Sequence, residues 1–347
     1  MNKDFWRGKK VLITGANGFK GSWLTKWLDL LGAEVLGISL EQDECSIYNE
    51  LKFSNRHTYI IGDVTDFLFL KKAVESFKPE IVFHLAAQAI VKEAVLRPVE
   101  TFSTNVMGAV NLLEVLRQAI NCPKSIVVVT SDKVYKNVEI YDFYKEENEL
   151  GGEEPYSASK ACEELVVTAY REAFFKDKNI GIATARASNI FGGGDHHFDR
   201  LIPYLIKTTF EGERPKIRNP LAIRPWQYIL DVLRGYMCLA EKLYKEPIKY
   251  AEAWNFGPKK TEIYTVEDIV NKILKTKMIV IGRSFKEANL LMIDAEKSYE
   301  RLGWEPIYSF QKGMEHTCRM YYEYFKGVAI NRLMDEAIDF YQKDLEV

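Results

Sequence analysis

Short apolar runs alternate with stretches of helical periodicity through the first half of this 347-residue chain. The apolar runs cover residues 10–14, 34–39, 59–61, 81–85, 125–129 and 180–186. Apolar residues at helical spacing cover 18–31, 68–77, 99–119 and 156–175. Strands that alternate with helices form right-handed βαβ units. The pattern therefore predicts an α/β protein with a Rossmann-type, doubly wound parallel sheet over residues 1–188.

The regular alternation stops after residue 188, where a glycine-rich loop begins a less regular segment. Helices are predicted at 201–210, 228–243, 265–274 and 309–325, with short strands near 215–218 and 253–258. We expect residues 189–326 to form a smaller mixed α/β lobe, with some crossing of the chain between the two lobes. No long linker separates them, which predicts a shared interface that encloses a cleft.

Residues 327–347 add an amphipathic helix. Its apolar positions are Ile330, Leu333, Met334, Ala337, Ile338 and Tyr341. Such a helix either docks on its own subunit or forms an oligomer contact. We favour docking on its own subunit.

The composition mainly excludes classes of protein. The chain has 47 Lys and Arg against 49 Asp and Glu, so it lacks the overall basic field that attracts nucleic acid or anionic membranes. No window reaches the roughly 18 apolar residues of a membrane span. The first apolar run, residues 11–13, is too short for a signal peptide, so we expect a cytoplasmic protein.

The cysteines and histidines give no metal or disulfide pattern. The five cysteines are scattered and contain no C-x-x-C spacing, which argues against zinc and against a disulfide framework. His196 and His197 are adjacent, so their side chains diverge. We therefore expect free thiols and no metal.

Candidate chemistry begins directly after the first predicted strand. Gly15, Gly18 and Gly21 form a G-x-x-G-x-x-G pattern that opens the first helix. Glycines permit a sharp turn and close approach to a pyrophosphate, and a helix N-terminus attracts its negative charge. Strand, turn and helix lie where this mechanism needs them, so we predict a dinucleotide site rather than a tight turn alone.

The ends of the next strands bear on which dinucleotide binds. Residues 39–43 read Ser-Leu-Glu-Gln-Asp, with no Lys or Arg to neutralise a 2′-phosphate, so NAD is favoured over NADP. Asp63 and Val64 follow a short strand and could hold the adenine edge. His84 precedes the small residues that close the fourth strand, and we interpret it as a packed strand-end histidine.

Two further groups of residues could carry catalysis. Tyr156 and Lys160 are about one helical turn apart, so a lysine ammonium there would lower the pKa of the tyrosine and make it a better base. Ser131, Asp132 and Lys133 follow the fifth strand, at the edge where open α/β sheets bind ligands. They are either a hydrogen-bond donor, an acid and a base, or a capped polar loop with a solvated ion pair; position alone favours neither.

Together these segments resemble the extended short-chain dehydrogenases/reductases that act on nucleotide sugars. Within that family, the match is closest to the CDP-glucose 4,6-dehydratase branch. The segments that carry the resemblance are residues 15–24, 84–87, 104–108, 130–133, 151–160, 189, 192–195, 217–220 and 224–227. The resemblance extends from Phe5 to about Tyr324.

The resemblance implies a reaction in which NAD, tightly bound, is regenerated within each turnover. Tyr156 would take the C4 hydroxyl proton while hydride passes to NAD, Ser131 would hydrogen-bond that oxygen, and Lys160 would bind the nicotinamide ribose. Asp132 would protonate the departing C6 hydroxyl, and Lys133 matches the lysine of the CDP-glucose branch. Hydride return to C6 would yield CDP-4-keto-6-deoxyglucose, for deoxysugar biosynthesis of surface polysaccharide.

The resemblance also implies binding residues and an assembly. The cofactor would contact Gly15, Asn17, Gly18, Phe19, Lys20, Gly21, Asp63, Val64, Leu85, Ala86, Ala87, Thr104, Tyr156 and Lys160. The sugar nucleotide would contact Gln88, Asn189, Arg200, Leu201, Arg218 and Arg224. Arginine forks suit phosphate oxygens. A homodimer is expected through the helices near 99–119 and 156–175.

Two other activities remain open. A nucleotide-sugar 4-epimerase would use the same Tyr156, and a 4,6-dehydratase could take another nucleotide sugar. A silent NAD-binding regulator would not need Ser131, Tyr156 and Lys160 together. An epimerase does not need an acid to expel the C6 hydroxyl, so Asp132 with Lys133 favours the dehydratase.

Overall fold

A parallel sheet of seven strands forms the centre of the molecule, in the order β11-β6-β5-β4-β1-β2-β3. The computed structural model describes residues 3–41, 44–139, 142–187, 189–198, 200–281 and 290–346. The strands of this sheet are β1 Lys10–Thr14, β2 Glu34–Ser39, β3 His57–Ile61, β4 Ile81–His84, β5 Ser125–Val129, β6 Gly181–Ala187 and β11 Ala253–Phe256. The predicted Rossmann-type α/β fold is confirmed.

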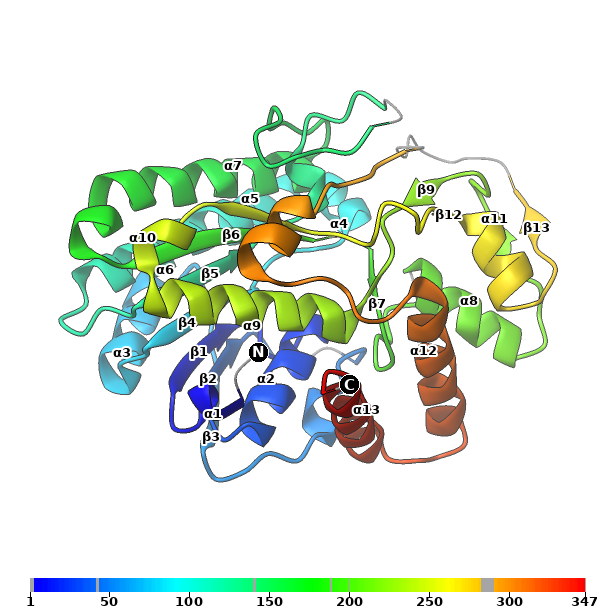
Figure 1. Ribbon diagram of the computed structural model, residues 1–347, viewed down its shortest axis with the longest axis horizontal. Helices are drawn as coiled ribbons and strands as arrows, with labels where there is room; N and C mark the ends of the chain where they lie inside the picture. The colour runs from blue at the N-terminus through cyan, green and yellow to red at the C-terminus, as the bar shows by residue number, and fades with distance from the viewer. Residues whose placement is uncertain are drawn as a thin grey trace.

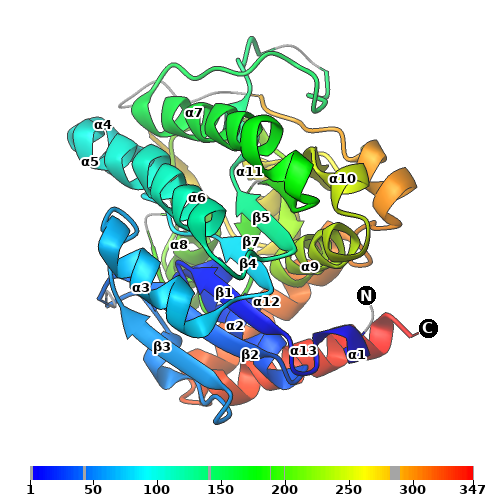
Figure 2. The same cartoon turned by 90° about the vertical axis from the view of Figure 1, so that its left-hand side faces the viewer.

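Helices cover both faces of the sheet (Figures 1 and 2). One face carries α3 Phe67–Phe77, α6 Gly108–Gln118 and α7 Pro155–Tyr170, which share one buried apolar cluster. The other face carries α2 Phe19–Leu30 and α9 Ile229–Lys245, which belong to a larger cluster. Each helix presents an apolar face to a sheet that is itself apolar on both sides, as parallel sheets require.

Shorter helices complete this domain. They are α1 Lys3–Trp6, α4 Val91–Leu96, α5 Pro98–Phe102 and α10 Pro247–Tyr250. A π-helical turn, Ser103–Met107, joins α5 to α6, so the single helix predicted over 99–119 is three consecutive helical segments. A second π-helical turn, Arg171–Phe175, extends α7 in the same way.

The elements α9 and β11 differ from the prediction, which placed both in the smaller lobe. In the structure β11 pairs in parallel with β6, and α9 packs against the sheet. The physical reason is their burial: Trp254 and Phe256 are fully buried in β11, and α9 buries most of its residues. The chain therefore crosses back into the Rossmann domain after residue 188. Ser188, at the predicted boundary, lies outside the described residues.

The smaller lobe, on the right of Figure 1, combines helices with short paired strands. Its helices are α8 Leu201–Phe210, α11 Val266–Asp268 and α12 Phe310–Phe325. Its strands are β7 Ile190–Phe191, β8 Lys216–Ile217, β9 Ile223–Arg224, β10 Gln227–Tyr228, β12 Tyr264–Thr265 and β13 Ile279–Val280, which pair two by two.

The C-terminal helix α13, Ile330–Asp344, docks on its own chain. The hydroxyl of Tyr341 donates to Asp231 Oδ1 at 2.6 Å and accepts from Arg234 Nε at 3.1 Å, both on α9. The Tyr341 ring also meets Trp27 of α2 edge-on, with centroids 5.6 Å apart. These contacts attach α13 to helices that cover the sheet.

Two features of the described residues bear on function. None of the helices there is both long and apolar enough to cross a membrane. Within the same residues, no group of three or more His, Cys, Asp or Glu side chains is arranged to hold a metal ion. The five cysteines are free thiols.

Candidate active site

The glycine loop between β1 and α2 is closely packed. Gly15 has a φ of +73°, and a Cβ there would lie 2.7 Å from the Ala86 nitrogen. A Cβ at Gly21 would lie 2.0 Å from the Gly15 carbonyl oxygen. Gly18 precedes α2 and provides no side-chain cap. The first N–H groups of this helix therefore face a turn that only glycine permits, which is the arrangement that phosphate binding uses.

Hydrogen bonds connect this loop to the end of β2. The Asn17 backbone N–H donates to Ser39 Oγ at 3.1 Å, and Asn17 Nδ2 donates to the Leu40 carbonyl at 2.9 Å. These bonds fix the turn against the strand end where the dinucleotide preference was predicted. Gln42 and Asp43 of that segment lie outside the described residues.

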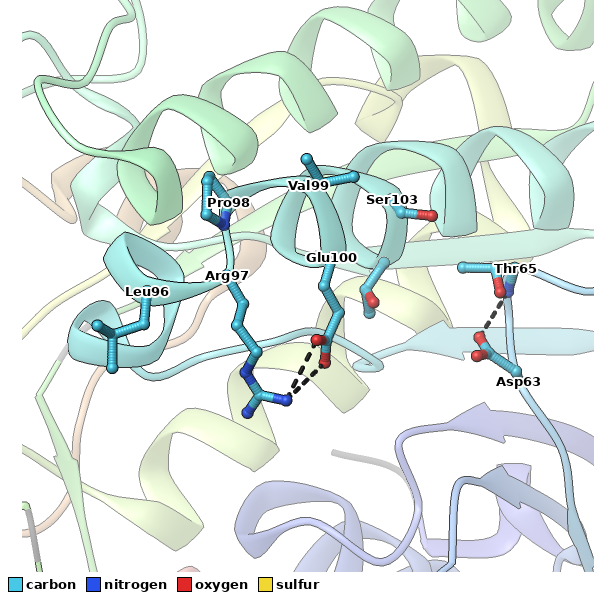
Figure 3. Close-up of a pocket in the computed structure, with 9 residues that line it drawn as sticks. Asp63, Thr65, Leu96, Arg97, Pro98, Val99, Glu100 and Ser103 are labelled. Atoms are coloured by element: carbon cyan, nitrogen blue, oxygen red, sulfur yellow. Dashed lines mark hydrogen bonds and ion pairs between the residues drawn. The ribbon is translucent and has the colours of Figure 1, made fainter.

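A pocket of about 530 Å³ opens beyond the end of β3 (Figure 3). Asp63 and Thr104, both predicted to contact the cofactor, line it. Asp63 Oδ1 accepts from the Thr65 N–H at 2.8 Å. Arg97 and Glu100 form an ion pair in the same pocket, at 3.2 Å. Val64, the neighbour of Asp63, is buried against Gly108.

The helix α7 holds Tyr156 and Lys160 at its first two turns. Glu154 caps it, because its carboxylate accepts the N–H of Tyr156 at 2.7 Å and of Ser157 at 3.0 Å. Burial raises the pKa of Tyr156, against the opposing effects of Lys160 and Ser131. Lys160 therefore lowers the pKa of Tyr156, as predicted, but burial raises that pKa by more.

The loop after β5 is buried rather than solvated. Ser131 Oγ donates to Asp132 Oδ1 at 3.0 Å and accepts the N–H of Lys133 at 3.2 Å. Asp132 is 3% exposed, and its Oδ2 has no hydrogen-bond partner. Burial raises the pKa of Asp132, although Lys133 opposes this. Ser131 does cap a short turn, but the solvated ion pair considered for Asp132 and Lys133 is excluded by this burial.

Lys160 contacts a carboxylate that the sequence reasoning missed. Its Nζ lies 2.6 Å from Glu163 Oε2 and 3.2 Å from the Val129 carbonyl oxygen. Glu163 is fully buried, and burial raises its pKa to about 7 despite Lys160. The available signal was its position three residues after Lys160, on the same face of the helix.

The other carboxylate oxygen of Glu163 faces His84. Glu163 Oε1 lies 3.8 Å from His84 Nε2, and neither atom has a hydrogen-bond partner. His84 Nδ1 lies 2.6 Å from Thr14 Oγ1. Burial lowers the pKa of His84 to about 3, so this histidine is neutral. It is packed at the strand end, as predicted.

Lys20, in the glycine loop, lies near the charged side chains around Lys160 and Asp132. Burial lowers its pKa to about 7, and the positive charges of Lys160 and Arg200 act in the same direction. Its Nζ lies 6.0 Å from the ring centroid of Tyr236 on α9. Lys20 was predicted as a cofactor contact, and the structure brings it within electrostatic reach of Lys160, Asp132 and Arg200.

The predicted substrate residues Arg200, Arg218 and Arg224 all lie in the smaller lobe. Arg200 Nη1 pairs with Asp195 Oδ2 at 3.0 Å, directly before Leu201 begins α8. Arg224, in β9, lies within electrostatic reach of Asp132. Arg218 follows β8 and is exposed. The first two therefore adjoin the catalytic groups.

The remaining two predicted substrate residues are fixed by local bonds. The Gln88 side chain bonds to the backbone of Ile90 at 2.8 and 3.0 Å. Asn189 has a φ of +31°, and its carbonyl accepts the Gln227 N–H at 3.3 Å. Leu85, Ala86 and Ala87 follow β4 beside Gly15, and Phe19 begins α2.

Comparison with known proteins identifies the family. The sequence profile described as GDP-mannose 4,6 dehydratase matches residues 12–317. The chain belongs to the GDP-mannose 4,6-dehydratase family. It is 41% identical over 339 residues to the CDP-glucose 4,6-dehydratase of Salmonella typhimurium, which covers 94% of both chains.

Solved structures share the fold of this GDP-mannose 4,6-dehydratase family member. The dTDP-glucose 4,6-dehydratase of Bacillus anthracis, in complex with NAD, has a TM-score of 0.78 at 22% identity, covering 91% of this chain and 97% of that one. The UDP-glucose 4-epimerase of Thermotoga maritima, with UDP-glucose, has a TM-score of 0.80 at 21% identity, covering 91% and 99%. At these identities the likeness concerns the fold.

Proposed function

We propose that this protein catalyses the NAD-dependent 4,6-dehydration of CDP-glucose to CDP-4-keto-6-deoxyglucose. The main support for dehydration is that Asp132 is a buried carboxyl with a raised pKa beside Ser131. A carboxyl whose raised pKa favours the protonated form can donate a proton to a departing hydroxyl group. The choice of CDP-glucose rests on the 41% identity to the Salmonella enzyme over nearly the whole chain.

The protein's own residues fit NAD. The turn at Gly15 and Gly21 leaves no room for a Cβ, and α2 begins without a side-chain cap. We assign the pyrophosphate to this turn and the adenosine end to the side of the sheet where Asp63 and Thr104 line a pocket. When bound, NAD accepts hydride from sugar C4 and later returns it to C6.

Tyr156 serves as the base for the first step. It takes the proton of the C4 hydroxyl, and Ser131 hydrogen-bonds the same sugar oxygen. The Lys160 ammonium stabilises the phenolate and so lowers the pKa of Tyr156. The result is a 4-keto sugar whose C5 proton is acidified by the new carbonyl.

Asp132 and Lys133 carry out the elimination. Lys133 Nζ lies 5.8 Å from the ring centroid of Tyr156, and we assign it the removal and return of the C5 proton. Asp132 protonates the C6 hydroxyl, which leaves as water. Arg200 and Arg224, which adjoin these groups, are assigned to the diphosphate of the sugar nucleotide.

The test is to incubate the purified protein with CDP-glucose and no added reductant. We expect a product lighter by one water, without net formation of reduced cofactor. Tyr156→Phe serves as the control and should form no such product. A product of unchanged mass would refute the dehydration and indicate 4-epimerisation. Parallel incubations with the dTDP, UDP and GDP sugars measure nucleotide preference.

We also propose a homodimer formed by the helices predicted for that role. Their exposed apolar residues, each at least 37% accessible, are Val99, Phe102, Met107, Leu165 and Phe174. Exposed apolar side chains on neighbouring helices favour an interface. Sedimentation at several concentrations tests the dimer, and a monomer at micromolar concentration contradicts it.

A further inference from the structure

The proposed dehydration leaves two side chains of the enzyme in exchanged protonation states. Tyr156 gains the O4 proton and cannot give it back, because the product keeps its C4 carbonyl. Asp132 loses a proton to the departing water. The C5 proton returns to C5, so the base is unchanged. One proton must therefore pass from Tyr156 to Asp132 before the next turnover.

A 4-epimerase does not have this requirement. Its tyrosine returns the proton to O4 when hydride returns to C4, so each turnover restores the starting state. The proton return is thus specific to the dehydration, and a structure that supports dehydration should provide a route between the two groups.

Ser131 lies between them. Its hydroxyl donates to Asp132 Oδ1 at 3.0 Å and is close enough to Tyr156 to lower the pKa of that phenol. The Lys133 N–H, at 3.2 Å, holds the Ser131 oxygen in place. A serine hydroxyl can accept one proton while it donates its own. Its oxygen can therefore connect the phenol to the carboxylate once the Tyr156 hydroxyl donates to it.

Solvent is a poor substitute for this connection. Asp132 is 3% exposed and Tyr156 9% exposed. The route through Lys160 ends at Glu163 Oε2 and the Val129 carbonyl, not at Asp132. Burial, which raises the pKa of Asp132, favours the protonated carboxyl as the end point.

We propose that Ser131 returns the proton from Tyr156 to Asp132 after each turnover. The Tyr156 O–H bond breaks as a new bond forms to Ser131 Oγ, while the Ser131 O–H proton passes to Asp132. The phenolate and the neutral carboxyl are restored together, and no electron changes centre. This inference rests on the proposed dehydration.

The test uses Ser131→Thr and Ser131→Val, which have nearly the same shape and differ in the hydroxyl, with Ser131→Ala as a further variant. Product is followed by rapid quench with CDP-glucose in excess. Loss of the Ser131 hydroxyl should slow both the first turnover and the later turnovers, and the later turnovers more. We expect Ser131→Val and Ser131→Ala to form about one product per site and then to turn over at least tenfold more slowly. Ser131→Thr should show no such burst.

Two further measurements separate proton return from a general loss of activity. Added imidazole should accelerate the steady state of Ser131→Val, with little effect on wild type, because it carries the proton instead. In weak buffer, an indicator dye should report proton exchange with the medium in the variant only. Cofactor binding, measured by fluorescence titration, checks that each variant is folded.

The outcomes distinguish this inference from the proposed function. If wild type releases a product lighter by one water, but the first and later turnovers of Ser131→Val slow equally and imidazole has no effect, the proton return is wrong and the dehydration stands. If wild type gives a product of unchanged mass, both are wrong, since epimerisation needs no return. A burst with imidazole rescue supports both.

Discussion

The sheet domain and the smaller lobe hold their functional side chains in different ways. At the sheet, Asp132, Tyr156 and Lys160 are each at most 9% exposed and lie on or after long, buried elements. In the lobe, Arg218 is exposed, and the strands around it are two residues long. Burial sets the proton affinity of the first group, whereas exposed arginines affect charge and fit. The difference indicates that reaction type and substrate affinity can change separately.

The strongest challenge to this separation is Asp132→Asn. The amide keeps the size of the side chain but cannot give up a proton, so elimination should slow by about 100-fold or more. Cofactor binding should not change. Quenched samples should then contain a sugar nucleotide two hydrogens lighter than the substrate. Undiminished turnover would remove Asp132 from the mechanism.

A smaller effect is expected from Arg218→Met in the lobe. The sequence predicts that Arg218 contacts the sugar nucleotide, and loss of that charged contact should raise KM for CDP-glucose about tenfold, with kcat nearly unchanged. Initial rates over a range of substrate concentrations measure both. Arg218→Lys, which keeps the charge, is the control and should recover part of the affinity. A fall in kcat as large as the fall in kcat/KM would show that the two regions are not separate.

Glu163→Gln tests how burial tunes the sheet residues. The pKa of Glu163 is about 7, so it acquires negative charge as pH rises through that value and then raises the pKa of Tyr156. A neutral glutamine removes this effect. The acidic limb of the kcat profile should therefore move to lower pH. His84 stays neutral throughout, whereas Lys20, whose pKa of about 7 is raised by the Glu163 charge, should titrate at lower pH in Glu163→Gln.

Glu163→Asp, which keeps the charge, is the matched control for that experiment and should move the profile less. An acidic limb at the same pH in wild type and Glu163→Gln would mean that Glu163 acts on packing alone.

The smallest effect on activity is expected from Tyr341→Phe in α13. The ring still packs on Trp27, but the bonds to Asp231 and Arg234 are lost. Urea unfolding should show a loss of about 1–2 kcal/mol with unchanged kcat. Phe340→Ala, at an exposed neighbour, should change stability by less than about 0.5 kcal/mol. A reduced kcat for Tyr341→Phe would connect α13 to the site.

Local patterns explain what could be predicted from the sequence. The first six strands of the sheet are apolar runs, and the glycine turn and the Tyr156–Lys160 pair each lie within one short segment. The place of β11 could not be predicted, because its partner β6 is distant in the chain. Glu163 was missed because an acid on a helix ordinarily faces solvent. Its burial depends on β4 and β5, which sequence spacing does not reveal.

The return of the chain into the sheet also affects its synthesis. When β6 leaves the ribosome, its outer edge has no partner until β11 follows about seventy residues later, roughly 4–14 s at common rates of translation. An unpaired edge of a buried strand is a template for wrong pairing. Nascent chains that pause between these two strands should therefore depend on chaperones more than chains that pause after β11.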